Sequence, residues 1–313
     1  MNKNTVRWIG RALMAVAIVF IIWKFSQQDL DFSLINFAHI TPGLIGLLLL
    51  YIATVFILAY GYFLILSGLA NKAPARLNTI RLYSMTGLYR YIPGNVMHLI
   101  GRNVIPATEP VSYAEVNIAS SLEIFALFIV ALVLAVVSVF KYFINYIQSI
   151  SLSSTQILLV VIIAIAIVIV LIIFRKKIRS LKDAFIEKVS RLSAVRISQY
   201  FVLVFLTLII NAITYLLLLY LLNAITPGSS AITILGLYIL SWLIGFVTPG
   251  APGGIGIRET MMVLLLDDAV SMDYLLLSAV LLRIISIVGD VAAFGLVQSF
   301  YTLRNKKSGL ATK

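Results

Sequence analysis

The sequence has 313 residues, of which 61% are hydrophobic and 12% are charged, and its mean hydropathy is +1.06. A soluble domain is about half apolar and a quarter charged, so this composition excludes an ordinary water-soluble protein. The net charge of +12 would suit nucleic acid, but the basic residues cluster at the ends of apolar runs, which is a membrane-topology pattern. With no cysteine and two distant histidines, the sequence also excludes disulfides and offers no metal-ligand spacing.

Six apolar stretches are long enough to cross a bilayer, for which a helix needs about 20 residues. A basic segment precedes the first stretch and no small-residue cleavage site follows it, so we expect a retained helix rather than a signal peptide. In chain order, full spans are predicted at 8–25, 42–69, 112–140, 156–174, 197–223 and 274–300.

Two more apolar stretches are each interrupted by helix-breaking residues. Residues 79–104 contain Pro93-Gly94, and residues 231–266 contain the segment TPGAPGGIG at 248–256. Proline and glycine both disfavour a continuous helix. Each stretch is therefore either one kinked span or a re-entrant hairpin that turns back near the bilayer centre.

The basic residues favour two hairpins, because the cytoplasmic loops of membrane proteins are enriched in Lys and Arg. If both stretches are hairpins and the N-terminus is cytoplasmic, the segment 175–196, with eight Lys and Arg, lies inside. Only Lys24 and Lys141 then lie in outer loops. If both stretches crossed, the basic segment would face outward. We therefore expect a multi-pass protein of the cell membrane with both termini in the cytoplasm.

The predicted fold is an all-α polytopic membrane protein with about six full spans and two re-entrant broken-helix hairpins. A span, a hairpin and a span follow one another over 42–140 and again over 197–300, and the two hairpins enter from opposite sides. This is an inverted repeat, which is typical of transporters. Residues 1–313 then form one membrane domain, with a basic cytoplasmic linker at 175–196 and a polar tail at 305–313.

The tips of the two hairpins are the predicted binding site. The second limb of each hairpin begins after its break, so free backbone N–H groups and the positive end of the helix dipole point into the protein. Arginines near both breaks add charge, and this combination suits a phosphate group. The alternative is that each break is only a packing kink. The candidate substrate-binding residues are Arg90, Pro93, Gly94, Asn95, Arg102, Gly253, Gly254, Gly256, Arg258, Glu259 and Arg283.

Charged side chains within membrane segments cost about 2.5–3.5 kcal/mol each near the centre, so they usually face a cavity or pair with one another. Glu123 and Asp290 are candidates for a charge relay. Arg283 and Asp290 are seven residues apart and share a helix face, so a structural ion pair between them is the alternative. We expect Arg90 to contact the ligand directly and Arg102, at the cytoplasmic end of its limb, to guard an inner entrance.

Three motifs resemble the lysylphosphatidylglycerol synthase transmembrane-region family. RYIPGNVMHLIGR at 90–102 is similar to the first hairpin of that family, and PGAPGGIGIRET at 249–260 is similar to the second. LLRIISIVGD at 281–290 resembles the last span, in which an arginine recurs at the position of Arg283. The resemblance covers about residues 10–305.

The resemblance implies a flippase-like membrane domain without the soluble domain that makes the modified lipid. Stand-alone members are linked to several lipids, including polyprenyl-phosphate-linked sugars and hopanoids. This chain departs from the family after Glu123, where Ile124 stands in place of a frequent arginine. The resemblance therefore does not fix the headgroup.

The expected function is translocation of a membrane lipid with an anionic phosphate headgroup, either a phospholipid or a polyprenyl-phosphate-linked lipid. The alternative is a polytopic enzyme that acts on a polyprenyl-phosphate-linked lipid, although the polar loops carry no dense acidic or histidine motif. We expect no enzymatic activity, no cofactor, no metal and no nucleic-acid partner. A second copy of the chain and a separate lipid-modifying enzyme are candidate partners.

Overall fold

The computed structural model describes residues 37–91, 97–149, 189–190, 192–248, 254 and 256–307. These residues are almost entirely helical, and their only β-type pairing is an isolated antiparallel bridge between Ile225 and Val270. The all-helical prediction is confirmed for this part of the chain. The predicted spans at 8–25 and 156–174 lie outside the described residues.

Four described helices are long and apolar enough to cross a membrane, and they coincide with four of the predicted spans. They are α2 (Phe37–Leu69), α5 (Tyr113–Ser149), α7 (Ala194–Leu221) and α10 (Met272–Lys307). Their runs of Leu, Ile, Val and Phe supply both the helical propensity and the apolar surface that lipid requires.

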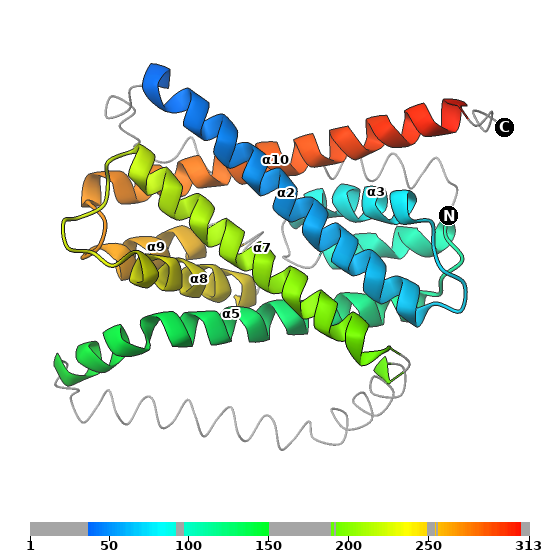
Figure 1. Ribbon diagram of the computed structural model, residues 1–313, viewed down its shortest axis with the longest axis horizontal. Helices are drawn as coiled ribbons and strands as arrows, with labels where there is room; N and C mark the ends of the chain where they lie inside the picture. Colours follow the sequence, from blue (N-terminus) through cyan, green and yellow to red (C-terminus); the bar gives the residue numbers. More distant parts are fainter. Residues whose placement is uncertain are drawn as a thin grey trace.

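The helices α2 and α7 cross the molecule side by side in opposite directions (Figure 1). A Cβ atom on Gly43 would lie 2.5 Å from the Leu221 side chain, and one on Gly61 would lie 2.9 Å from the Tyr200 ring. Residue numbers increase along α2 while the numbers of the contacting residues in α7 decrease, so the two helices are antiparallel. Small residues at such contacts let two membrane helices approach closely.

The first interrupted segment returns to the end of the bundle where it began. It consists of α3 (Arg76–Gly87), a 3₁₀ turn at Leu88–Tyr91, α4 (Met97–Gly101) and a second 3₁₀ turn at Arg102–Ala107. At its base, the carboxylate of Glu109 accepts hydrogen bonds from the backbone N–H of Ala75 at 2.6 Å and from the Asn78 amide at 2.5 Å. We call this segment the first hairpin.

The second interrupted segment closes in the same way, but through backbone groups. It consists of α8 (Ala231–Val247) and α9 (Ile257–Leu266). The N–H of Thr226 donates to the carbonyl of Ala269 at 3.1 Å, and the N–H of Ser271 donates to the carbonyl of Ala224 at 2.8 Å. We call this segment the second hairpin.

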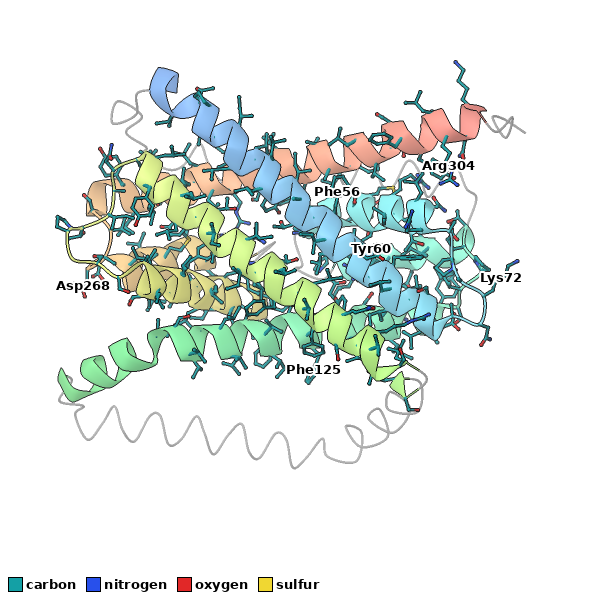
Figure 2. All side chains as sticks on the ribbon, in the orientation of Figure 1. Phe56, Tyr60, Lys72, Phe125, Asp268 and Arg304 are labelled. Atoms are coloured by element: carbon teal, nitrogen blue, oxygen red, sulfur yellow. The ribbon has the colours of Figure 1, made fainter. Side chains whose placement is uncertain are left out.

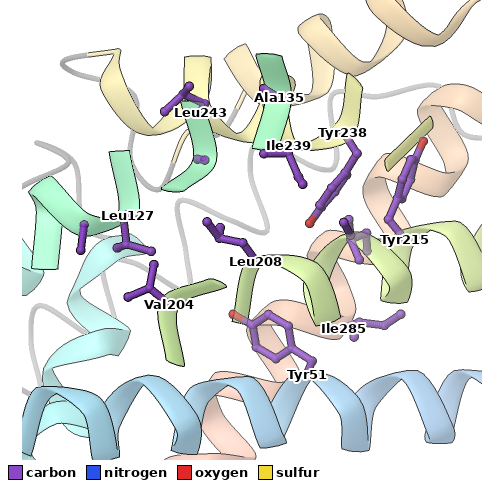
Figure 3. Packing of buried hydrophobic residues seen from close by; sticks show 14 of the residues in the cluster. Tyr51, Leu127, Ala135, Val204, Leu208, Tyr215, Tyr238, Ile239, Leu243 and Ile285 are labelled. Carbon is purple, nitrogen blue, oxygen red and sulfur yellow. The ribbon is translucent and has the colours of Figure 1, made fainter. Parts of the chain in front are cut away.

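The two hairpins enter the bundle from opposite ends. The first follows the C-terminal end of α2 and the second follows the C-terminal end of the antiparallel α7, and Figure 1 shows α3 opposite α8 and α9. Lys72 and Arg304 lie at the end that holds the base of the first hairpin, whereas Asp268 lies at the other end (Figure 2). Between them, buried side chains from all these helices form one hydrophobic core, which contains the tyrosines Tyr51 and Tyr238 (Figure 3).

Candidate functional site

A cavity of about 160 Å³ lies where the two hairpins meet the four long helices. All six elements line it, which places it at the centre of the bundle rather than on one flank. An apolar cavity of about this size holds a benzene-sized molecule, so the space suits a small group rather than a large one. The polar and charged lining residues are Tyr51, Thr54, Tyr83, Arg90, Tyr91, His98, Glu123, Thr207, Asn211, Tyr238, Arg258, Arg283 and Ser286.

The pair Arg102–Glu123 holds the return limb of the first hairpin against α5. The two terminal nitrogens of Arg102 donate to the two carboxylate oxygens of Glu123 at 2.9 and 2.8 Å. The guanidinium also lies over the rings of Tyr62 and Tyr83, at 4.6 and 4.4 Å from their centres. Arg102 is 1% exposed and does not line the cavity. Arg102 was expected to guard an inner entrance, and this expectation is wrong. The side chain lies in the core because it pairs with the buried carboxylate of Glu123 on α5.

The pair Arg283–Glu259 does the same for the second hairpin and α10. A terminal nitrogen of Arg283 lies 3.0 Å from a carboxylate oxygen of Glu259, and its Nε donates to the same oxygen at 3.2 Å. The other oxygen of Glu259 accepts the N–H of Gly256 at 2.7 Å. In each hairpin the return limb is thus paired with the long helix that follows it, with the positions of acid and base exchanged. The alternative interpretation, a structural ion pair between Arg283 and Asp290, is not found among the described contacts.

Asp290 instead joins α10 to the first hairpin and to α2. Its carboxylate accepts hydrogen bonds from the hydroxyls of Tyr91 at 2.6 Å and Tyr51 at 3.2 Å. A terminal nitrogen of Arg90 lies 3.8 Å from the same carboxylate, and the Nε of Arg90 donates to the carbonyl of Gly87 at 2.9 Å. The Arg90 side chain is 32% exposed and lines the cavity. This contact is longer than the other two ion pairs, and it leaves part of the guanidinium facing the space.

Arg258 is positioned by an aromatic side chain rather than by a carboxylate. A terminal nitrogen donates to the Tyr238 hydroxyl at 2.6 Å, and the guanidinium carbon lies 4.9 Å from the centre of the same ring. Gly254 and Gly245 allow this arrangement, because a Cβ on Gly254, at φ +73°, would lie 3.2 Å from the Gly245 backbone. Within the described part of the chain, Arg258 forms no ion pair with a carboxylate.

The charges around the cavity do not cancel. Among the described residues in and directly behind the cavity lining there are four arginines and three carboxylates, and each of these carboxylates is matched to one arginine. The remaining positive charge belongs to Arg258, which lines the cavity. A cation in a poorly solvated space attracts an anion more strongly than one in water, so the chemistry of this cavity favours an anionic ligand.

The structure brings only some of the predicted site residues to the cavity. Arg90, Glu123, Gly254, Arg258 and Arg283 line it, whereas Arg102, Gly256, Glu259 and Asp290 lie behind the lining. The N–H of Gly256 was expected to face a ligand, but it donates to the carboxylate of Glu259 instead. Predicted residues that lie outside the described part of the chain are Pro93, Gly94, Asn95 and Gly253.

Most of the tyrosines and small polar residues of the cavity were not predicted from the sequence to lie in the site. Tyr51, Tyr91 and Tyr238 hold the charged groups in place. In a membrane protein, the first interpretation of a tyrosine is an interfacial anchor. Asn211, in the middle of the apolar α7, is the one signal that could have indicated a polar interior on this helix. No family model matches the chain, and no curated protein matches it.

Proposed function

We propose that this protein moves a lipid with an anionic phosphate headgroup between the leaflets of a membrane. The observation that carries the proposal is Arg258, a cation without a carboxylate partner in the described core, in a cavity lined by both hairpins. A guanidinium binds phosphate oxygens through a fixed fork of N–H donors. The similarity of the two hairpin motifs to the lysylphosphatidylglycerol synthase transmembrane-region family supports the same function.

We further propose that both hairpins are re-entrant and that the two halves form an inverted repeat. The 17 residues of α8 span about 25 Å, which is less than the roughly 30 Å of bilayer hydrocarbon. The ends of each hairpin are hydrogen-bonded to one another, and the two bases lie at opposite ends of the bundle. Lys72 and Arg304 mark the cytoplasmic end under the positive-inside rule.

In this mechanism the phosphate enters the cavity while the acyl or prenyl chains stay in the lipid. Arg258 binds the phosphate first, and Arg90 turns from Asp290 toward it. Rocking of one half against the other then exposes the headgroup to the opposite leaflet, as in other inverted-repeat transporters. The ion pairs Arg102–Glu123 and Arg283–Glu259 keep each hairpin fixed to its own half during this movement.

The proposal is tested by lipid movement in sealed vesicles that contain the purified full chain. Fluorescent phosphatidylglycerol is placed in both leaflets, and an impermeant reductant quenches the outer pool, so that further loss of signal measures transfer. Arg258→Ala should lower the rate at least about tenfold, as expected for loss of a charge-assisted contact of about 1.5–3 kcal/mol. Arg258→Lys should restore part of it, because a point charge replaces the fork.

Arg76→Ala is the matched control, since Arg76 is exposed at the start of α3 and does not line the cavity. Equal rates of lipid transfer by the Arg258→Ala and Arg76→Ala variants, at equal amounts of folded protein, would show that Arg258 does not bind the lipid. The lipid is also recovered and its mass is measured. An unchanged mass supports transport, and a converted lipid would support the enzymatic alternative.

A further inference from the structure

The lining of the cavity also restricts which chemical group can be attached to the phosphate. Its walls combine cations, neutral hydroxyl and amide groups, and aromatic rings, while the one carboxylate of the described lining, Glu123, is paired with Arg102. A headgroup is selected by what these groups can satisfy as well as by what they repel.

An ammonium group would find no free carboxylate among the described residues around this space. Glu123, the one carboxylate of the described cavity lining, accepts both terminal nitrogens of Arg102 and the hydroxyl of Tyr83 at 2.9 Å. Behind the lining, Glu259 is held by Arg283 and by the N–H of Gly256. Asp290, also behind the lining, accepts hydrogen bonds from the hydroxyls of Tyr51 and Tyr91. An ammonium would therefore enter a space in which the uncompensated charge is already a cation, Arg258, and like charges repel one another.

Hydroxyl groups, in contrast, would find several partners. The Asn211 amide nitrogen donates to the carbonyl of Thr207 at 2.8 Å, and no described residue donates to its amide oxygen. The Nδ1 atom of His98 is buried without a hydrogen-bond partner among the described residues. The hydroxyls of Thr54 and Ser286 donate to backbone carbonyls, so their lone pairs can accept. A buried polar atom without a partner, such as Nδ1 of His98, is costly, and a ligand hydroxyl would satisfy it while also bonding the acceptors of Asn211, Thr54 and Ser286.

One wall of the cavity is aromatic. Trp242 and Phe246 stack at 4.9 Å between ring centres, and both line the cavity. Flat apolar rings of this kind pack against the C–H groups of a small carbon skeleton and exclude water from it. The volume of about 160 Å³ limits that skeleton to a few carbons beside the phosphate.

We infer that the ligand is a phosphodiester lipid whose phosphate carries a small, uncharged, hydroxyl-bearing group, and that lipids with an ammonium headgroup are rejected. The inference rests on the proposed function, because it assumes that the cavity takes a lipid phosphate. It adds a specificity for the group beyond the phosphate, set by Asn211, His98 and the filled carboxylates.

The test is native mass spectrometry of the purified full chain with four dioleoyl lipids at equal concentration. Phosphatidylglycerol carries phosphate and hydroxyls, and phosphatidylmethanol carries the same charge without hydroxyls. Phosphatidylethanolamine adds an ammonium, and diacylglycerol lacks the phosphate. We expect phosphatidylglycerol to bind at least about tenfold more tightly than phosphatidylethanolamine, which corresponds to about 1.4 kcal/mol, and also more tightly than phosphatidylmethanol.

A variant that adds one negative charge to the lining makes the test specific to the cavity. Asn211→Asp adds a carboxylate to the lining and should shift the preference toward phosphatidylethanolamine. Asn223→Asp is the matched control, because Asn223 is exposed in a turn at φ 52°, a backbone conformation that aspartate also tolerates. Thermal unfolding of both variants serves as the folding check.

The outcomes distinguish headgroup specificity from phosphate binding. If wild type binds phosphatidylethanolamine or phosphatidylmethanol as tightly as phosphatidylglycerol, the headgroup inference is wrong and the phosphate site stands. If diacylglycerol binds as tightly as phosphatidylglycerol, the phosphate site itself fails and the proposed function with it.

Discussion

The Tyr238 hydroxyl accepts a 2.6 Å hydrogen bond from Arg258 while the Tyr238 ring lies beneath the same guanidinium. One side chain therefore both orients the cation and packs against it. The ring itself is fixed by stacking on Tyr215 at 4.9 Å between centres. Arg258 is thus held in one direction before any ligand arrives, which lowers the ordering cost of binding.

The two contributions of Tyr238 can be separated by substitution. Tyr238→Phe removes the hydrogen bond and keeps the ring, so we expect phosphatidylglycerol binding to weaken by about fivefold, in keeping with about 1 kcal/mol for one hydrogen bond. Tyr238→Leu removes the ring as well and should weaken binding further. The measurement is lipid affinity of the purified variants. An affinity unchanged by both substitutions would show that Arg258 is oriented without Tyr238.

The pair Arg102–Glu123 should contribute to stability rather than to ligand binding. Glu123→Ala leaves a buried cation without its partner, and we expect the free energy of unfolding to fall by about 3–5 kcal/mol. The double substitution Arg102→Met with Glu123→Met removes both charges and should cost less than the single one. Unfolding in graded denaturing detergent measures both. A single variant as stable as wild type would mean that Arg102 finds another partner.

The sequence predicted the helical class and the long apolar helices, because the length of an apolar run depends on lipid, which acts on every membrane protein in the same way. Four predicted spans are found as α2, α5, α7 and α10. The pairing of charges was not predictable in the same way. Arg283 lies seven residues from Asp290 on one helix but pairs with Glu259, because the fold of the second hairpin brings α9 beside α10. Such partners depend on tertiary packing, which periodicity along one helix does not contain.

Each hairpin is predicted to have both of its ends on one face of the membrane. Single cysteines can replace Lys72 and Pro110 at the base of the first hairpin, and Ser230 and Asp267 at the base of the second, since all four are exposed. An impermeant maleimide should label the first two only from the cytoplasmic side and the last two only from outside. The chain has no cysteine of its own to interfere. Labelling of positions 72 and 110 from different sides would mean that the first hairpin crosses the membrane.

A methyl group added at Gly245 should strain the close contact of α8 with α9. A Cβ on Gly245 would lie 3.0 Å from the Cβ of Arg258, so Gly245→Ala should push the limbs apart and displace the guanidinium. Overpacking of this kind costs about 1–3 kcal/mol, and we expect both a lower unfolding temperature and slower lipid transfer. Gly46→Ala is the control, because Gly46 on α2 has open space around it. Equal unfolding temperatures and transfer rates of the Gly245→Ala and Gly46→Ala variants would show that the contact of Gly245 with Arg258 is not tight.

Asp290 is predicted to compete with the ligand for Arg90. The contact between them is 3.8 Å long, against 2.8 and 3.0 Å in the other two ion pairs, so it is the weakest of the three. Asp290→Asn keeps an oxygen that can accept from Tyr51 or Tyr91 but removes the charge. Arg90 then offers its full charge to a phosphate, and binding of phosphatidylglycerol should tighten by about fivefold. Transfer between leaflets should become slower, because no carboxylate recaptures Arg90 when the phosphate leaves. Asp267→Asn, in the exposed turn after α9, controls for the loss of one negative charge. Weaker binding by the Asp290→Asn variant would show that Asp290 orients Arg90 for the ligand instead of competing with it.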